Sequence, residues 1–425
     1  MSLDTTRDAA AARVLDEVDA LTEEMVALIS ALVRIPSVGG SDAEHEAQAW
    51  FAEVLVAGGL EVDHWRIPLD ELAAEPDFPG MEVARAEAWG LVGRLPGSRP
   101  ADARTLLLDG HIDVVPPGDV AAWSRDPFSG EITGDVHTGV LHGRGACDMK
   151  AGLVAAHWAV QAVRRSGTGL GGDLLLASVQ GEEDGGLGTY ATLRRGWTAD
   201  ACVIPEPTNL DVVPANAGAL TFRLRIRGQA THAASRLAGV SAIEKLWPVW
   251  QAIQALEHRR EGGHDHPISL GTVHAGDWAS SVPDLLVAEG RMGVALDETV
   301  EQAEAALEAA VAAACAADPW LRDHPAEVEW WGGRFASGRL PEGSDLADRV
   351  QQAHRTATGG AANDVRAVSY GSDLRLLVNQ GDIPTVQYGP GDVGVAHGPH
   401  EHVRLADVAA TARTLALLAL DVGGR

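Results

Sequence analysis

The chain has 425 residues, of which 46% are hydrophobic, and it carries a formal net charge of -27. This length favours two domains. The negative charge argues against nucleic acid or an anionic membrane as a partner, although solvation of the surface alone also explains it. The cysteines, Cys147, Cys202 and Cys315, have no paired spacing. We therefore expect a reducing, cytoplasmic compartment, without a disulfide framework or zinc knuckle. Residues 5–21 lack an apolar core and no run is long enough to span a membrane, so neither a signal peptide nor a membrane span is expected.

The first hundred residues predict helices followed by short strands. Apolar residues recur at helical spacing over 10–34, and this helix should end before Pro36, because the residue that precedes a proline is disfavoured in a helix. A second helix is predicted over 42–57, and residues 68–80, rich in proline and acid, predict a surface loop. The predicted strands are 60–65, 88–92 and 105–108.

The stretch from 106 to 152 carries the first chemical signal. An apolar strand stops at His111, and Asp113 follows two residues later, where its side chain points the same way and could orient the imidazole. Asp148 lies at a glycine-rich turn before a helix predicted to reach Arg165. From the residues alone, Asp148 is either a metal ligand or a helix N-cap.

Two further strands also end in acidic residues. The strand 173–179 leads into Glu182 and Glu183, and the strand 201–204 leads into Glu206. The glycine-rich run 167–172 precedes a strand rather than following one, which argues against a nucleotide-binding loop. Strands that alternate with helices predict an α/β domain with a mainly parallel sheet.

The pattern changes near residue 216. The next elements have the order β-α-β-β-α-β, which is typical of a ferredoxin-like α+β domain, and a kink is expected at Pro248. We therefore predict a metal-binding domain of residues 1–216 and 336–425, with a lid or dimerisation domain inserted at 217–335. The predicted elements of the insertion are 220–227, 240–260, 268–273, 284–295, 298–318 and 327–331, and those of the resumed first domain include 344–358, 373–379, 385–388 and 405–420.

Together with His397, these residues predict a metal centre. Each has an ordinary alternative, since acidic pairs are often solvated turns and a lone histidine is often a surface residue. However, loops at the carboxyl ends of parallel strands converge on one crevice. Two imidazoles and three carboxylates suit two divalent ions with one bridging carboxylate. Zinc is favoured by the histidines, and cobalt or manganese is the alternative.

Five segments in matching order make the chain resemble the dinuclear-zinc peptidases and deacylases. This family includes acetylornithine deacetylase, succinyl-diaminopimelate desuccinylase, aminoacylase and glutamate carboxypeptidase, and the resemblance covers nearly the whole chain. The segments are Gly110-His111-Ile112-Asp113-Val114-Val115-Pro116, Gly143-Arg144-Gly145-Ala146-Cys147-Asp148-Met149-Lys150, Gly181-Glu182-Glu183, Glu206-Pro207-Thr208 and Ala396-His397-Gly398.

The resemblance implies a role for each site residue. One metal would be held by His111, Asp148 and Glu206, and the other by Glu183 and His397, with Asp148 bridging. Glu182 would be the general base, Asp113 would orient His111, and His232 of the lid domain would stabilise the oxyanion, often in the partner's site of a homodimer joined through that domain. Arg291 matches the family's carboxylate-binding arginine, and Ser280 stands where the family usually has asparagine in a substrate-contacting loop.

These features predict hydrolysis of the amide bond of an N-acyl amino acid, in the manner of acetylornithine deacetylase. A dipeptidase or carboxypeptidase acting on small peptides is the enzymatic alternative. A metal-binding homologue without catalysis is the alternative of another class, although Glu182 argues against it, because such a protein needs no base. The same site could also run in reverse, towards amide synthesis.

Overall fold

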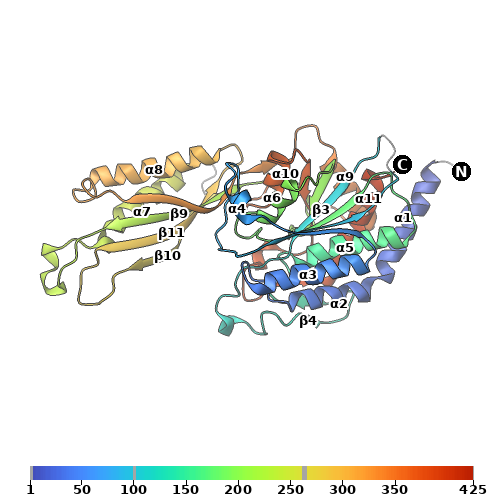
Figure 1. Ribbon diagram of the computed structural model, residues 1–425, viewed down its shortest axis with the longest axis horizontal. Helices are drawn as coiled ribbons and strands as arrows, with labels where there is room; N and C mark the ends of the chain where they lie inside the picture. The colour runs from blue at the N-terminus through green and yellow to red at the C-terminus, as the bar shows by residue number, and fades with distance from the viewer. Residues whose placement is uncertain (1–2, 99–101, 261–265, 425) are drawn as a thin grey trace. The chain divides into compact units, whose positions relative to one another are not determined.

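The computed structural model describes residues 3–98, 102–260 and 266–424, which form two compact units (Figure 1). The first unit takes Met1–Ala215, Arg339–Ala367 and Asp373–Arg425, and the second takes Asn216–Gly338 and Val368–Ser372. A two-stranded sheet of β8 (Ala215–Asn216) and β13 (Gly338–Arg339) lies where the chain passes from one unit to the other. The second unit is therefore an insertion in the sequence of the first.

The first unit is built on a six-stranded sheet in the order β1-β2-β6-β3-β7-β14. The four strands from β6 to β14 are parallel to one another, β2 pairs antiparallel with β6, and the edge strand β1 pairs antiparallel with β2. This confirms the predicted α/β class with a mainly parallel sheet. The strands are β1 (Glu61–Arg66), β2 (Trp89–Leu95), β3 (Leu106–His111), β6 (Leu174–Val179), β7 (Ala201–Ile204) and β14 (Thr385–Gln387).

Helices cover both faces of this sheet, so its central strands are apolar on both sides (Figure 1). In β3, Leu106 and Leu108 join one core while Leu107 joins the other. The first core includes α1 (Leu3–Ala20), α2 (Thr22–Val33), α3 (Asp42–Ala57), α5 (Lys150–Arg165), α9 (Leu346–Ala357) and α11 (Leu405–Val422). The second includes α4 (Leu69–Ala73), α6 (Leu187–Arg194) and α10 (Leu374–Asn379).

Two local predictions were wrong. The helix predicted over 10–34 is two helices, α1 and α2, which meet at Leu21, and the Thr22 hydroxyl donates to the main-chain oxygen of Asp19 at this break. The loop predicted over 68–80 contains the five-residue helix α4, because Leu72 is buried in the second core. The Thr22 hydrogen bond and the burial of Leu72 are contacts that the local apolar pattern does not specify.

A small antiparallel sheet lies beside the parallel one in the first unit. It pairs β4 (Glu131–Thr133) and β15 (His402–Arg404) with the central strand β5 (Val140–His142). The short 3-10 helices η1 (Val120–Ala122) and η3 (Val393–Val395) belong to neighbouring loops. Pairing of β5 with β15 brings the segment before Asp148 next to the segment after His397.

The second unit has the predicted β-α-β-β-α-β order, and its sheet runs β10-β11-β9-β12 with every neighbour antiparallel. Phe222, Leu224 and Ile226 lie in its core beneath two helices, of which α7 contains Pro248. The elements are β9 (Gly218–Arg227), η2 (Ala233–Ala238), α7 (Ala242–Arg259), β10 (Ile268–Ala275), β11 (Leu285–Val294), α8 (Val300–Ala317) and β12 (Glu327–Phe335).

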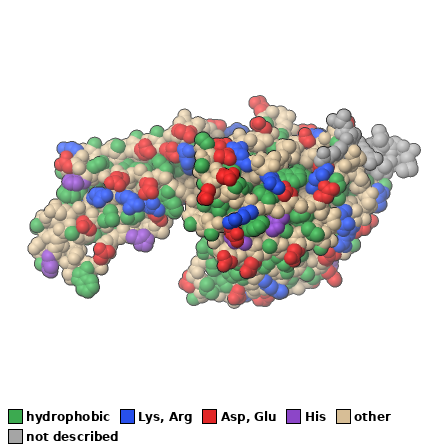
Figure 2. Space-filling view, in the orientation of Figure 1, with side chains coloured by type: hydrophobic (Ala, Val, Ile, Leu, Met, Phe, Trp, Pro, Cys, Tyr) green, Lys and Arg blue, Asp and Glu red, His purple; other side chains and the backbone are tan. Residues whose placement is uncertain are grey.

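On the face shown in Figure 2, acidic and basic side chains are interspersed over the described part of the chain. No helix within the described ranges is both long enough and apolar enough to cross a membrane.

Candidate metal centre

The predicted ligands lie in the loops at the carboxyl ends of the parallel strands. His111 is the last residue of β3, Glu182 and Glu183 follow β6, and Glu206 follows β7. Asp148 lies two residues before α5, with Met149 at the N-cap position. Because β3, β6 and β7 are parallel neighbours, their carboxyl ends bring these side chains to one place.

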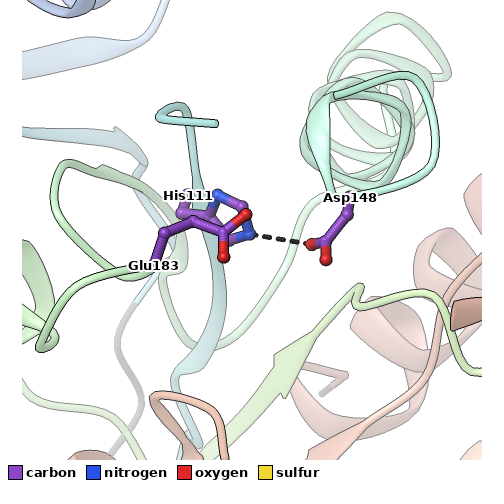
Figure 3. Close-up of side chains that lie close together, drawn as sticks. All are labelled: His111, Asp148 and Glu183. Atoms are coloured by element: carbon purple, nitrogen blue, oxygen red, sulfur yellow. Dashed lines mark hydrogen bonds and ion pairs between the residues drawn. The ribbon is translucent and has the colours of Figure 1, made fainter. Parts of the chain in front are cut away.

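Asp148 lies between the two imidazoles. Its Oδ1 is 3.0 Å from Nε2 of His111, and its Oδ2 is 3.5 Å from Nε2 of His397, which is also 3.2 Å from Oε1 of Glu183. Figure 3 shows His111, Asp148 and Glu183 turned toward one another from a strand end, the start of a helix and a loop. A carboxylate with one oxygen toward each imidazole is suited to bridge two cations.

The remaining carboxylates complete a compact donor set. Ligand atoms of His111, Asp148 and Glu183 lie within 4.8 Å of one another, and so do those of His111, Glu182 and Glu206. The structure therefore brings together all five residues predicted as ligands, with the predicted base Glu182 beside them. Two imidazoles with several carboxylates are a donor set that zinc, cobalt and manganese accept.

The charges of this set call for a cation. Burial raises the pKa of Glu182 well above its usual range, with a further contribution from the charge of Asp373. Burial and the charge of Asp148 do the same for Glu206. Burial alone would raise the pKa of Asp148, but hydrogen bonds from the two imidazoles lower it overall. Buried carboxylates that repel one another fit a site that holds positive charge.

Asp113 contacts His111 through its main chain. The Nδ1–H of His111 donates to the Asp113 main-chain oxygen at 2.9 Å, whereas the Asp113 carboxylate lies 3.9 Å from Nδ1. This bond leaves Nε2 of His111 facing the site. The carboxylate instead accepts from the main-chain N–H groups of Gly181, Glu182 and Glu183, at 2.8, 3.3 and 3.3 Å. Asp113 thus holds the turn that carries Glu182.

Sequence reasoning missed the ion pairs behind this turn. The side chain of Arg85 is fully buried, 2.8 Å from Oδ2 of Asp184 and 3.1 Å from Oε1 of Glu44. Asp184 also accepts from the main-chain N–H of Val83 at 2.8 Å. The acidic run after β6 was the available signal, but sequence alone does not indicate which acid points inward to an arginine a hundred residues away.

The predicted lid residues all lie in the second unit, where His232 and Arg291 are both exposed. His232 precedes η2, and its Nδ1 accepts from the main-chain N–H of Ala234 at 3.1 Å. The main-chain oxygen of Ser280 accepts from Ala233 at 2.8 Å, so the structure brings Ser280 beside the His232 segment. Arg291 lies on β11, with its guanidinium carbon 5.2 Å from the ring centre of Phe335.

Comparison with known proteins found relatives over almost the whole chain. The model of peptidase family M20/M25/M40 matches residues 107–421. The chain is 28% identical to N-formyl-4-amino-5-aminomethyl-2-methylpyrimidine deformylase of Halalkalibacterium halodurans, over 95% of each chain. It is 35% identical to succinyl-diaminopimelate desuccinylase of Methylobacterium nodulans, over 60% of this chain and 58% of that one. Among solved structures, the dipeptidase Dug1p of Saccharomyces cerevisiae has a TM-score of 0.76 with coverage of 98% and 99%, and its 16% identity supports the fold alone.

Proposed function

Because the chain belongs to peptidase family M20/M25/M40 and is an amide-bond hydrolase, we propose that it acts on small N-acyl amino acids, in the manner of acetylornithine deacetylase. One observation of the structure supports metal-dependent hydrolysis, namely that Asp148 turns one oxygen to each of two imidazoles among buried carboxylates. The similarity to succinyl-diaminopimelate desuccinylase supports an N-acyl amino acid as the substrate. Family membership implies divalent metal ions.

We assign His111, Asp148 and Glu206 to one ion and Glu183 and His397 to the other, with Asp148 bridging. Zinc is the metal proposed, with cobalt or manganese as alternatives. A pair of such ions polarises a carbonyl group and makes water a stronger acid.

Glu182 is proposed as the general base. It is only 7% exposed, and Asp113 fixes its turn by accepting from the main-chain N–H groups of three successive residues. The Glu182 carboxylate would take a proton from the attacking water and deliver it to the leaving nitrogen, so that the amine departs neutral. A base held by main-chain hydrogen bonds keeps its position through both transfers.

The second unit is proposed to complete the site as a lid. His232 would donate a hydrogen bond to the oxyanion that forms when the carbonyl is attacked. Arg291 would bind the substrate carboxylate, for which the planar guanidinium is suited, and Ser280 would contact the substrate beside His232. Because Arg291 is expected to bind a carboxylate, a change of Arg291 tests whether the substrate carries one.

A second candidate substrate is an N-formylated aminomethylpyrimidine. It is favoured by the similarity to the deformylase, which extends over 95% of both chains. This candidate has no carboxylate, whereas an N-acyl amino acid has one, so the two hypotheses make opposite predictions for Arg291.

The experiment compares wild type with Arg291→Lys on N-acetyl and N-succinyl amino acids, dipeptides and the formylated pyrimidine. If the substrate carries a carboxylate, loss of the bidentate contact should lower kcat/KM roughly 10–100-fold. An unchanged kcat/KM on the preferred substrate would contradict the proposed role of Arg291. Turnover of the pyrimidine alone would replace the amino-acid proposal with the second candidate.

We also propose a homodimer joined through the second unit. Ile243 and Trp247 are 53% and 63% exposed on α7, and they line an apolar groove with Ile268 and Leu270 of β10. Because β10 is an edge strand, it has main-chain groups available for pairing with another chain. A second copy of the chain would cover both features.

Light scattering should give twice the chain mass, and Trp247→Glu should shift the protein toward the monomer. Val56→Glu is the matched control, because Val56 of the first unit is 61% exposed. A wild-type monomer with full activity would contradict the dimer.

A cytoplasmic location is proposed on the basis of the free thiols, since all three cysteines are buried and unpaired with each other.

A further inference from the structure

A buried ion pair lies directly behind Asp148. Arg144 and Glu401 are each only 1% exposed, and the Arg144 guanidinium contacts Oε2 of Glu401 although the residues are 257 positions apart. Arg144 also lies over the ring of Trp123, with 5.3 Å from its guanidinium carbon to the ring centre. A buried charge pair of this kind costs desolvation and persists where its hydrogen bonds are well formed.

The second oxygen of Glu401 holds the main chain of the metal-binding turn. Oε1 accepts from the N–H of Cys147 at 3.0 Å and from the N–H of Asp148 at 3.2 Å. The main-chain oxygen of Glu401 accepts from Gly143 at 3.1 Å. One residue therefore fixes both ends of the turn from Gly143 to Asp148.

Glu401 also belongs to the segment of the other imidazole. It lies four residues after His397, just before β15, and β15 pairs with β5, which leads into the Asp148 turn. His397 itself has a φ of 60°, a left-handed conformation that is uncommon for a residue other than glycine. The geometry of Asp148 relative to His397 thus depends on how these two segments are joined.

We propose that Glu401, neutralised by Arg144, is a positioning residue that sets the Asp148 carboxylate between the two imidazoles. This inference rests on the proposed function, because it takes Asp148 as the bridging ligand. Residues that orient metal ligands are commonly worth 10–100-fold in metal affinity. The contact runs through the main-chain N–H of Asp148, so any acceptor at the position of Oε1 should retain most of the effect.

The alternative is that the pair only stabilises the fold. The chain offers a matched control for this alternative in Asp173, which is 6% exposed and lies just before β6, at the end of that strand opposite Glu182. Asp173 accepts from Nε of Arg94 at 2.8 Å and from the main-chain N–H of Gly97 at 2.9 Å. It has the chemistry of Glu401 but lies at the end of β6 opposite the residues proposed as ligands.

The experiment compares two double variants, Arg144→Met/Glu401→Gln and Arg144→Met/Glu401→Leu. Both remove the charge pair and have similar volume, but only the glutamine retains an oxygen that can accept from Cys147 and Asp148. Zinc affinity of the metal-free proteins is measured by competition with a chromophoric chelator, and their melting temperatures report on the fold.

We expect the leucine variant to bind zinc roughly 10–100-fold more weakly than the glutamine variant. The control Arg94→Met/Asp173→Leu should lower the melting temperature and leave zinc affinity unchanged. Equal affinities of the two Glu401 variants, or an equal loss in the control, would overturn the inference. If the leucine variant does not fold, Glu401→Asp replaces it, because the shorter side chain keeps the charge but does not reach both N–H groups. Wild-type zinc affinity in Glu401→Asp would then overturn the inference.

The wild type separates this inference from the proposed function. If wild-type protein binds no zinc, cobalt or manganese, the proposed metal centre fails, and the inference fails with it. If the wild type binds metal and the Glu401 variants do not differ, only the inference is overturned.

Discussion

The two units differ in how far they bury their candidate functional side chains. In the first, His111, Glu182 and Glu206 are all below a tenth exposed, at the ends of strands with apolar faces, although His397 is exposed. In the second, Arg291 is exposed on strand β11 of the antiparallel sheet, and His232 is exposed just before η2.

This difference in exposure indicates when each group is in an environment that favours catalysis. Burying carboxylates costs desolvation, which a cation and main-chain hydrogen bonds must offset, so the first unit is organised before substrate arrives. An exposed imidazole costs little but is not held in a dry environment, where a hydrogen bond to an oxyanion is strongest. We therefore expect the groups of the first unit to contribute more to catalysis, and those of the second to contribute only with substrate bound.

The largest effect should come from removing metal. Elemental analysis of protein prepared without chelator should give up to two ions per chain, and thorough chelation should abolish activity, because metal polarisation contributes several kcal/mol, or roughly 10⁴-fold in rate. His111→Ala should lower both metal content and activity. Restoration by zinc, cobalt or manganese identifies the metals that the site accepts, and full activity of rigorously metal-free protein would disprove the metal centre.

Glu182→Gln should retain the metals and lower kcat by ~10²–10⁴-fold, the usual contribution of general acid–base catalysis. Glu183→Gln is the matched control, because the neighbouring carboxylate is assigned as a ligand and its change should lower metal content. Single-turnover rates together with metal analysis separate the two variants. Small and equal effects would refute this division of roles.

His232→Ala should retain both metals and the fold but lose roughly 10²–10³-fold in kcat, the scale of one oxyanion donor. If a dimer supplies this residue to the partner's site, mixing His232→Ala chains with Glu182→Gln chains should restore part of the activity, because mixed dimers have one site with both groups intact. No recovery after verified subunit exchange would assign His232 to its own chain's site or to a structural role.

The sequence predicted the fold and the family because both depend on local signals. The helix α3 and the strand β7 have the predicted bounds, since an apolar pattern defines each and Gly58-Gly59 follows α3. The resemblance to the dinuclear-zinc peptidases and deacylases is confirmed by the family match over residues 107–421. Of the residues proposed as ligands, His111, Glu183 and Glu206 were identified because they end or follow apolar strands whose parallel order brings their ends together.

Contacts between distant segments were not predictable in the same way. Glu401 stands between two histidines in the sequence, like many solvated acids, and only the pairing of β5 with β15 turns it toward Arg144. The Asp113 carboxylate was expected at His111, but it bonds the main chain of a turn about seventy positions later. Such positioning residues depend on three-dimensional packing, which periodicity and motif spacing do not specify.

The smallest expected effect concerns a buried histidine outside the proposed metal centre. His157 lies inside α5 and is 3% exposed, and its ring packs edge-on against Phe51 with 5.9 Å between ring centres. Within the described residues, no group hydrogen-bonds its Nδ1. Burial lowers the pKa of His157 to about 4, and the charges of Arg164 and Arg165 add to this.

The sign of the resulting pH dependence follows from proton uptake. Above pH 6.5 the imidazole is neutral in both states, so the stability is fully present; between pH 6.5 and 4 the unfolded chain binds a proton that the folded chain does not. Stability therefore falls as the pH is lowered through this window, by about 3 kcal/mol in total at roughly 1.4 kcal/mol per pH unit.

Urea unfolding of wild type and His157→Leu, at equal metal content, should give similar free energies at pH 7.5. At pH 4.5 the variant should be more stable than wild type by about 2–3 kcal/mol, because leucine takes up no proton. His137→Gln, a change at an exposed histidine, should follow the wild type at both pH values. If wild type and His157→Leu lose stability in parallel, burial of His157 does not control acid sensitivity. The cost of burying an ionisable side chain would then matter only at the metal centre.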